Sequence, residues 1–180
     1  NADIAFVNGG GIRKQIEAGD ITLDDIYSVH PFGNTMCVIR VTGQQVLDAL
    51  EWGARAVPSE NGGFLQVSGL TYEIHTGVAS SAEKDENGMF TRVSGEYRVK
   101  NVMVGGQPLE LDKTYTLASH NYMLLGHGDG YTMFDGCEVL GEDMMVDNQV
   151  LITYITTTLG GVVGEQYANP YGDGRIVAVE

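Results

Sequence analysis

Three consecutive glycines, Gly9–Gly11, directly follow a short apolar run, Asp3–Val7, and limit what the chain can form next. The run shows no polar alternation, so it predicts a fully buried strand. Glycine continues a strand poorly, because it costs backbone entropy and packs no side chain. We therefore expect the strand to end in a glycine turn, where the backbone can approach a ligand closely and offer it free N–H groups.

Two polar residues flank this turn and suit ligand binding. Asn8 can both donate and accept hydrogen bonds. Arg13 carries a planar fork of donors that matches phosphate or carboxylate groups. The same pattern also fits a structural turn followed by a surface arginine, and the residues of this segment leave both interpretations open.

Helix-start patterns recur along the chain. Thr-x-x-Asp at 22–25 and Thr-x-x-Gln at 42–45 both match the capping box, in which two side chains satisfy free backbone N–H groups. A third helix is expected to begin at Asp147 as its N-cap and to end at the glycine pair 160–161. The helix that follows position 42 has one apolar face, formed by Val46, Leu47, Leu50 and Ala54.

Short apolar or β-branched segments predict the strands. Residues 64–74 predict one long strand, and a bulge at Ser68–Gly69 would reconcile the two parities of its apolar residues. Gly105–Gly106 predicts a turn between two further strands, and residues 79–96 a loop or hairpin. Because helices and strands are interspersed without strict βαβ alternation, we predict one α+β domain, a mixed β-sheet flanked by helices. The remaining strands are expected at 35–41 and 174–179.

Composition and charge narrow the class of protein. The 180 residues are 43% hydrophobic and 19% charged, which is typical of one globular domain. A net charge of −14 disfavours nucleic-acid strands and anionic membranes as partners. Cys37 and Cys137 lack metal-ligand spacing, and their apolar surroundings favour free thiols over a disulfide. The chain begins almost inside its first strand, so we interpret it as part of a longer protein.

Two other segments carry candidate binding residues. Asp129 lies between glycines in the loop 126–130, where its carboxylate could accept hydrogen bonds from a vicinal diol such as a ribose. Phe32 lies between a proline and a glycine, so its ring could stack on a base whose edge Asn34 would read. The competing interpretations are an ordinary Asp-Gly turn and a core anchor.

The histidines show no metal-ligand spacing, so we interpret them as structural or solvated side chains. We also find no motif that would make a serine a nucleophile. The four histidines are His30, His75, His120 and His127.

Taken together and in order, these motifs resemble the C-terminal domain of the bacterial and animal 5′-nucleotidases, a family that includes UDP-sugar hydrolase. The resemblance extends over nearly the whole chain. Each motif is modest, and the ordered set is specific. The segments that carry it are 8–13, 29–34, 62–70, 126–131 and 174–176.

This resemblance implies a substrate-binding site. Arg13 would contact phosphates or ribose, Phe32 would stack on the base, Asn34 would bond the base edge, and Asp129 would take the ribose hydroxyls. Asn8 would lie near the nucleoside. The residues assigned to substrate binding are Asn8, Gly10, Arg13, Phe32, Asn34, Tyr122 and Asp129.

The second side of the aromatic sandwich departs from the family pattern. The family usually has an aromatic residue six positions before the aspartate, and here that position is Met123. The loop reads Gly-His-Gly-Asp where the family commonly has Gly-Gly-Asp, so one inserted residue would restore Tyr122 to the stack. We therefore predict Tyr122 as the second ring.

The resemblance also implies that residues 1–180 are the specificity domain of a larger hydrolase. An N-terminal metallophosphoesterase domain, absent here, would hold two divalent metal ions, such as zinc or manganese. The whole enzyme would hydrolyse nucleoside monophosphates to nucleoside and phosphate. With neither catalytic residues nor a cofactor of its own, this chain is expected to be inactive alone.

Alternatives remain open for the activity. The substrate could be a 2′,3′-cyclic nucleotide, as in the 2′-phosphodiesterase/3′-nucleotidases, or a UDP-sugar. A non-catalytic nucleoside-binding module is the alternative from another class. The expected partners are a nucleotide or nucleoside and the N-terminal domain, without nucleic-acid strands or a membrane span. The expected location is extracellular, periplasmic or at the cell surface.

Overall fold

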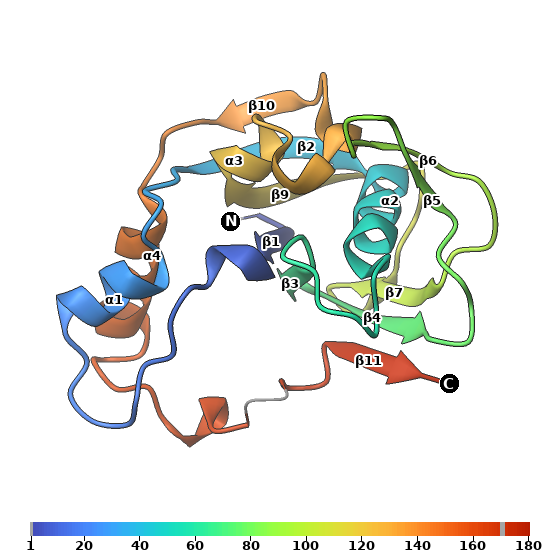
Figure 1. Ribbon diagram of the computed structural model, residues 1–180. Helices are drawn as coiled ribbons and strands as arrows, with labels where there is room; N and C mark the ends of the chain where they lie inside the picture. Colours follow the sequence, from blue (N-terminus) through green and yellow to red (C-terminus); the bar gives the residue numbers. More distant parts are fainter. Residues whose placement is uncertain (1, 170–171) are drawn as a thin grey trace.

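The computed structural model describes residues 2–169 and 172–180 and shows an α+β arrangement of strands and helices (Figure 1). The helices are α1 Leu23–Val29, α2 Gly43–Ala54, α3 Asn121–Leu124 and α4 Asp147–Thr153. The strands are β1 Ile4–Asn8, β2 Met36–Thr42, β3 Leu65–Ser68, β4 Leu70–His75, β5 Ala82–Lys84, β6 Phe90–Val93, β7 Val99–Val104, β8 Gln107–Pro108, β9 Thr114–His120, β10 Glu138–Gly141 and β11 Ile176–Val179.

The strands form two mixed sheets and one hairpin. The five-stranded sheet has the order β10-β2-β9-β1-β3, and the four-stranded sheet has the order β11-β4-β7-β8. In the first, β1 runs parallel to β9 and antiparallel to β3. The hairpin β5-β6 falls within the segment 79–96, as one of the two predicted alternatives. The predicted mixed-sheet α+β class is confirmed.

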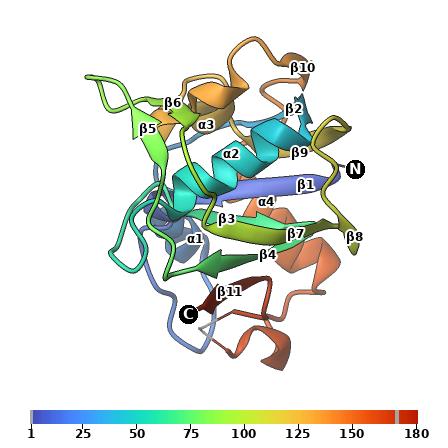
Figure 2. The same ribbon diagram turned by 90° about the vertical axis from the view of Figure 1, so that its right-hand side faces the viewer.

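Helix α2 lies where the two sheets meet. It contacts β2 and β3 of the first sheet and β7 of the second (Figure 2). Its buried side chains include Val46, Leu50 and Ala54 of the predicted apolar face, whereas Leu47 is only partly buried against the core. Both predicted capping boxes, at 22–25 and 42–45, are formed, and they open α1 and α2.

The predicted long strand at 64–74 is wrong in one respect. Instead of passing through a bulge, the chain leaves the first sheet at β3 and enters the second at β4, turning at Gly69 with φ +80°. A Cβ atom at Gly69 would lie 2.1 Å from the carbonyl oxygen of Asp3, so only glycine fits this crossing. The change of parity in the sequence therefore marks a change of sheet.

The prediction for Asp147 is also wrong. The N-cap of α4 is Val146, and Asp147 is the first helical residue, with its Oδ1 accepting a hydrogen bond from the amide of Asn148 at 2.8 Å. Beyond Thr153 the helix widens into a π-helical turn, and it stops before Gly160 and Gly161, which both have positive φ. The predicted glycine end of the helix is therefore confirmed.

Helices α1 and α4 lie side by side, away from α2 (Figure 1). Within the described residues, no helix is both long enough and apolar enough to cross a bilayer. Cys37 is buried and Cys137 is half-buried, and both thiols are free.

Candidate functional site

The predicted glycine turn is present at the end of β1, but its chemistry differs from the expectation. The amide of Gly9 donates to the carbonyl of Phe64 and that of Gly10 to the carbonyl of Gly62, both at 2.7 Å. These two N–H groups are therefore already used within the protein. The expectation that they would be free to bind a ligand is wrong. A Cβ atom at Gly11 would lie 2.8 Å from the Oδ1 of Asn8. The turn needs glycine because its neighbours occupy the space.

Four polar side chains meet beside this turn; we call them the site cluster: Asn8, His120, Tyr122 and Asp129. The Nδ2 of Asn8 donates to Asp129 Oδ2 at 2.6 Å, and the Oη of Tyr122 donates to Asp129 Oδ1 at 3.2 Å. The Nε2 of His120 lies 3.1 Å from the Oδ1 of Asn8. Asn8 and His120 meet because they end β1 and β9, which are parallel neighbours.

The position of Asp129 is set mainly by backbone contacts. Asp129 has φ 55° and ψ 15°, a left-handed conformation that costs energy for most residues other than glycine. Its carbonyl accepts a hydrogen bond from Trp52 Nε1 at 2.9 Å. A Cβ atom at the preceding Gly128 would lie 2.3 Å from ring atoms of Tyr122, so that ring lies directly on the loop backbone. These contacts fix the backbone of Asp129, from which its carboxylate reaches Asn8 and Tyr122.

Arg13 and Phe32 form a second group close to the same turn. The guanidinium carbon of Arg13 lies 5.8 Å from the centroid of the Phe32 ring, within the range of a cation–π contact. Arg13 also donates from Nη1 to the carbonyl of Gly10 at 3.1 Å. The Phe32 side chain is 60% exposed, so the alternative of a core anchor does not hold. The structure therefore brings Arg13 and Phe32 together at the surface, beside Gly10.

The structure also bears on the choice between Tyr122 and Met123. Tyr122 is 43% exposed, whereas Met123 is fully buried. Of the two side chains, only the Tyr122 ring could contact a ligand. The Tyr122 ring packs near His120, at 5.9 Å between centroids. No ring contact links Tyr122 to Phe32 among the described residues. A base held between these two rings remains a prediction.

Asn34 lies close in sequence to Phe32, and its backbone has a structural task. Its carbonyl accepts a hydrogen bond from the amide of Asp147 at 2.9 Å, which joins this loop to the start of α4. Asn34 is half-buried. Its side chain stays a predicted contact for the base.

Burial sets the protonation of the site cluster. It lowers the pKa of His120, so the imidazole is neutral near neutral pH. Burial and the neighbouring Asp129 carboxylate raise the pKa of Tyr122, so its hydroxyl keeps the proton that it donates. The cluster therefore carries one negative charge, on Asp129, surrounded by neutral donors.

The guanidinium of Arg55 interacts with the charge of Asp129. The guanidinium of Arg55 lies over the ring of Trp52, with its central carbon 3.7 Å from the ring centroid. Burial lowers the pKa of Arg55, and the Asp129 carboxylate offsets part of that effect. Trp52 thus hydrogen-bonds to the Asp129 backbone, and the Arg55 charge attracts the Asp129 carboxylate. No sequence motif indicated either role.

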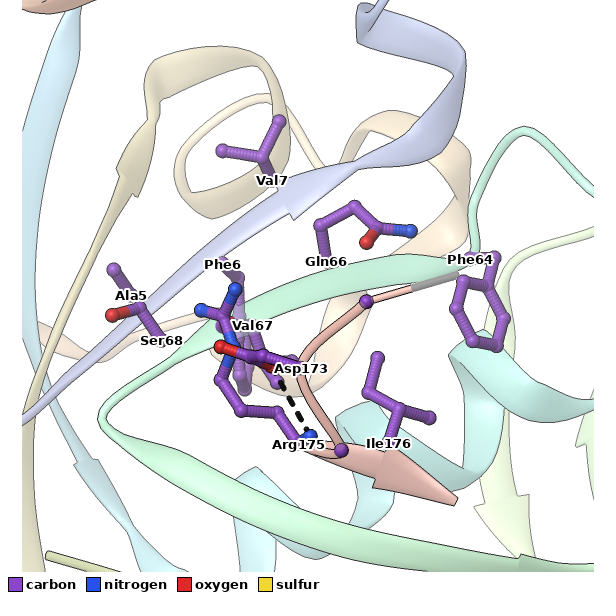
Figure 3. A pocket seen from close by; sticks show the side chains of 12 residues that line it. Ala5, Phe6, Val7, Phe64, Gln66, Val67, Ser68, Asp173, Arg175 and Ile176 are labelled. Carbon is purple, nitrogen blue, oxygen red and sulfur yellow. Dashed lines mark hydrogen bonds and ion pairs between the residues drawn. The ribbon is translucent and has the colours of Figure 1, made fainter. Parts of the chain in front are cut away.

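A recess of about 510 Å³ lies between β1, β3 and the segment that leads into β11 (Figure 3). None of the seven predicted residues lines it. Its basic side chain, Arg175, is engaged: Nε pairs with Asp173 at 2.8 Å and Nη1 donates to the carbonyl of Val67 at 2.5 Å. We interpret these contacts as the attachment of the β11 segment to the first sheet.

His120 was missed as a member of the site. Metal-ligand spacing, the signal by which histidines are recognised in a sequence, does not detect a single histidine that hydrogen-bonds to an amide. Its partner Asn8 is 112 positions away in the chain. The available signal was its place as the last residue of a predicted strand, which would have been informative only if that strand had been paired with the first.

Comparisons with known proteins agree with the fold and the motifs. Residues 1–136 match the family described as 5′-nucleotidase, C-terminal domain. The trifunctional nucleotide phosphoesterase YfkN of Bacillus subtilis is 35% identical over 178 residues, which are 99% of this chain and 11% of that protein. A 5′-nucleotidase of Vibrio vulnificus is 32% identical over 154 residues, 86% of this chain and 24% of that protein.

A solved structure resembles the chain over nearly its full length. The 5′-nucleotidase precursor from Thermus thermophilus superposes with a TM-score of 0.80 and 33% sequence identity, covering 99% of this chain and 32% of that one. The chain thus spans a third or less of each of these relatives. The family match, the shared fold and the ordered motifs show that this chain belongs to the 5′-nucleotidase C-terminal domain family.

Proposed function

We propose that this chain is the substrate-specificity domain of a metal-dependent nucleotide phosphohydrolase, a 5′-nucleotidase, and that it binds the nucleoside part of the substrate. The relatives named above are nucleotide phosphoesterases and nucleotidases. One observation carries the proposal: a fixed carboxylate, Asp129, and an exposed ring and cation, Phe32 and Arg13, converge on the same glycine turn.

Asp129 suits a ribose because its carboxylate is only partly occupied. Each of its oxygens accepts one hydrogen bond, from Asn8 or Tyr122. A carboxylate offers about four lone-pair sites, so one site on each oxygen remains for a pair of neighbouring hydroxyls. The carboxylate that carries the only charge of the site cluster would then bind a neutral diol.

Phe32 and Arg13 suit a base and a phosphate. A base stacked on an exposed ring gains about 1–3 kcal/mol, and a charge-assisted hydrogen bond about 1.5–3 kcal/mol. Arg13 takes part in no ion pair among the residues that the structure describes, whereas its neighbour Lys14 faces Asp25 at 3.6 Å. Ordering a small ligand offsets part of these gains, so weak binding of a nucleoside is expected.

The chemistry of hydrolysis is proposed to lie outside this chain. In the described ranges 2–169 and 172–180, no group of three or more His, Cys, Asp or Glu side chains could hold a metal ion. The proposal places two divalent metal ions in an N-terminal metallophosphoesterase domain of the same protein, which would be exported or held at the cell surface.

A broader substrate range is the second candidate. The YfkN relative is named a trifunctional nucleotide phosphoesterase, which favours activity on more than one class of nucleotide. Hydrolysis by the protein with its N-terminal domain should therefore also be measured with cyclic 2′,3′-nucleotides and UDP-sugars. A non-catalytic nucleoside-binding module would bind nucleosides equally well, but its parent protein would hydrolyse none of them.

Calorimetry with adenosine and AMP tests the binding site. The substitutions Phe32→Ala and Asp129→Ala should each weaken binding by about tenfold or more, because a stacked base or a diol contact contributes that much. The matched controls are Asp112→Ala and Tyr167→Ala, which remove an exposed carboxylate and an exposed ring outside the site. Unchanged affinity in both site variants would remove these residues from the site.

Hydrolysis assays test the wider proposal. The 180-residue chain alone should release no phosphate from AMP in the presence of divalent metal ions, whereas the protein with its N-terminal domain should. Robust hydrolysis by the chain alone would overturn the assignment of catalysis to another domain.

A further inference from the structure

The buried imidazole of His120 is the one member of the site cluster to which neither the motifs nor the proposed function assigns a task. It lies at the end of β9 and is only 6% exposed, so it cannot contact a large ligand directly. Its Nε2 is nevertheless 3.1 Å from the Oδ1 of Asn8, and the Nδ2 of the same amide is 2.6 Å from Asp129 Oδ2. His120 is therefore two hydrogen bonds away from the carboxylate.

We propose that His120 is a positioning residue: as an Nε2–H donor it holds the side-chain amide of Asn8 in one orientation, and the amide in turn holds the Asp129 carboxylate for the ligand. This inference rests on the proposed function, because it gives a task to a residue behind the proposed nucleoside site. It concerns a residue that acts through others, and no chemical step is assigned to it.

The direction of each hydrogen bond follows from the groups involved. An ionised carboxylate only accepts, so the NH₂ of Asn8 must face Asp129. The carbonyl oxygen of the same amide then faces His120 and can only accept, so Nε2 of His120 must carry a proton. A reversed Asn8 amide would set its oxygen against the carboxylate and its NH₂ against the N–H of His120. The proton on Nε2 therefore selects one of two possible amide orientations.

The second nitrogen of the ring supports the same assignment. Nδ1 of His120 is buried and has no hydrogen-bond partner in the described part of the chain. A proton on Nε2 has Asn8 Oδ1 as its acceptor at 3.1 Å, whereas a proton on the buried Nδ1 would lack an acceptor of comparable geometry, which is costly. Burial also lowers the pKa of His120, in the same direction. Both effects favour a neutral ring with its single proton on Nε2.

The consequence for the ligand site is preorganisation. Asn8 holds Oδ2 and Tyr122 holds Oδ1, so the carboxylate of Asp129 is fixed at both oxygens. Without a donor at position 120 the Asn8 amide could turn over, and the carboxylate would lose one of its two anchors. The positioning role requires a hydrogen-bond donor at residue 120, facing Asn8 Oδ1. A side chain of similar volume without a donor should therefore not replace His120.

Two substitutions separate the donor from the volume. His120→Gln keeps an N–H at a similar reach, whereas His120→Leu keeps an apolar side chain without a donor. Ser119→Ala is the matched control, because Ser119 is also 6% exposed on β9 and its hydroxyl lies 3.8 Å from Met123 Sδ, away from Asn8. Urea denaturation of each variant shows whether the fold is kept.

Adenosine binding measured by calorimetry gives the first readout. We expect about a tenfold loss of affinity for His120→Leu, a change of less than about threefold for His120→Gln, and no change for Ser119→Ala. Wild-type affinity in a folded His120→Leu variant, with Asp129→Ala still impaired, would overturn this inference alone. Absence of adenosine and AMP binding by the wild-type chain would instead overturn the proposed function, and with it any role of His120 in binding.

The tautomer of His120 gives a readout that a merely structural role would not move, and it needs no folded Leu variant. Long-range ¹H–¹⁵N spectra of the wild-type chain above pH 7 should show a neutral ring with its proton on Nε2. In Asn8→Ala, which removes the acceptor, the two tautomers should become mixed. A proton on Nδ1 in the wild type, or an unchanged pattern in Asn8→Ala, would overturn the positioning role.

Discussion

Two groups of polar side chains, one buried in the core and one that reaches the surface, serve different ends in this molecule. The first, the core polar pair, consists of Glu51 in α2, which is fully buried, and Arg98, which is 4% exposed. These side chains bond to the backbone: Glu51 Oε2 accepts from the amide of Val99 at 2.9 Å, and Arg98 Nη1 donates to the carbonyls of Ala54 and Val57. The pair thus ties α2 to the start of β7.

The second group, the site cluster, bonds mainly within itself. Asn8, His120 and Asp129 form a chain of side-chain hydrogen bonds that ends at the exposed Tyr122. A polar group joined to the backbone of two elements stabilises their packing, whereas one that leads to the surface leaves acceptors for a ligand. The comparison teaches that the partners of a buried polar group, and not its residue type, indicate its task.

The largest expected effect comes from the core polar pair. Arg98→Met should lower the free energy of unfolding by about 3–5 kcal/mol, because it leaves two backbone carbonyls without their donor and removes the positive charge that acts on the buried Glu51 carboxyl. Nucleoside affinity of the folded fraction should not change. Urea denaturation and calorimetry measure the two quantities. Arg92→Met, at an exposed ion pair with Glu83, is the control and should change stability little.

A smaller effect is expected at the glycine turn. There the substitution should weaken nucleoside binding and leave the fold intact, whereas Arg98→Met should weaken the fold and leave the affinity unchanged. In Gly11→Ala the new Cβ atom would meet the Oδ1 of Asn8, so the amide must shift. We expect about a tenfold loss of adenosine affinity with a fold that still unfolds cooperatively. Gly77→Ala, where a Cβ atom would meet nothing within 4 Å, is the matched control. Equal adenosine affinity in Gly11→Ala and Gly77→Ala would show that the orientation of the Asn8 amide does not affect binding. The site cluster would then not differ from the core polar pair in this respect.

The pH dependence of stability sharpens the contrast further. Burial raises the pKa of Glu51 above its ordinary value of 4.5, so the folded state binds its proton more tightly than the unfolded chain does. The stability that the protonated form contributes is complete below about pH 4.5 and is lost as the pH rises through the folded pKa.

Glu51→Gln has no proton to lose and is free of this loss. The difference in unfolding free energy, variant minus wild type, should therefore increase as the pH rises from 4.5. Urea titrations at several pH values measure it. A difference that stays constant with pH would show that Glu51 does not titrate with folding.

The smallest stability effect is expected at Phe32. Because its ring is 60% exposed, Phe32→Ala should change the free energy of unfolding by less than about 0.5 kcal/mol, although it weakens nucleoside binding. Thermal and urea unfolding measure this. If Phe32→Ala lowered the free energy of unfolding by several kcal/mol, the ring would stabilise the fold. Phe32 would then not be a residue that serves ligand binding alone.

Local signals predicted much of the fold because their physics is local. The capping boxes at 22–25 and 42–45 depend on residues three positions apart, and both are formed. The proline and glycine beside Phe32 left its ring either exposed or a core anchor, and the structure shows that it is exposed. The break at Gly69 was misread because the sequence shows a change of parity but not which sheet receives the next strand.

For the candidate site, the sequence by itself determined which residues have suitable chemistry: Asn8, Arg13, Phe32 and Asp129, each marked by an adjoining glycine or proline pattern. Only the tertiary structure decided which of them meet, that the amides of Gly9 and Gly10 are already used, and that His120 stands behind Asn8. The physical reason is distance along the chain. Parallel pairing of β1 with β9 brings together residues more than a hundred positions apart, and no local pattern encodes that pairing.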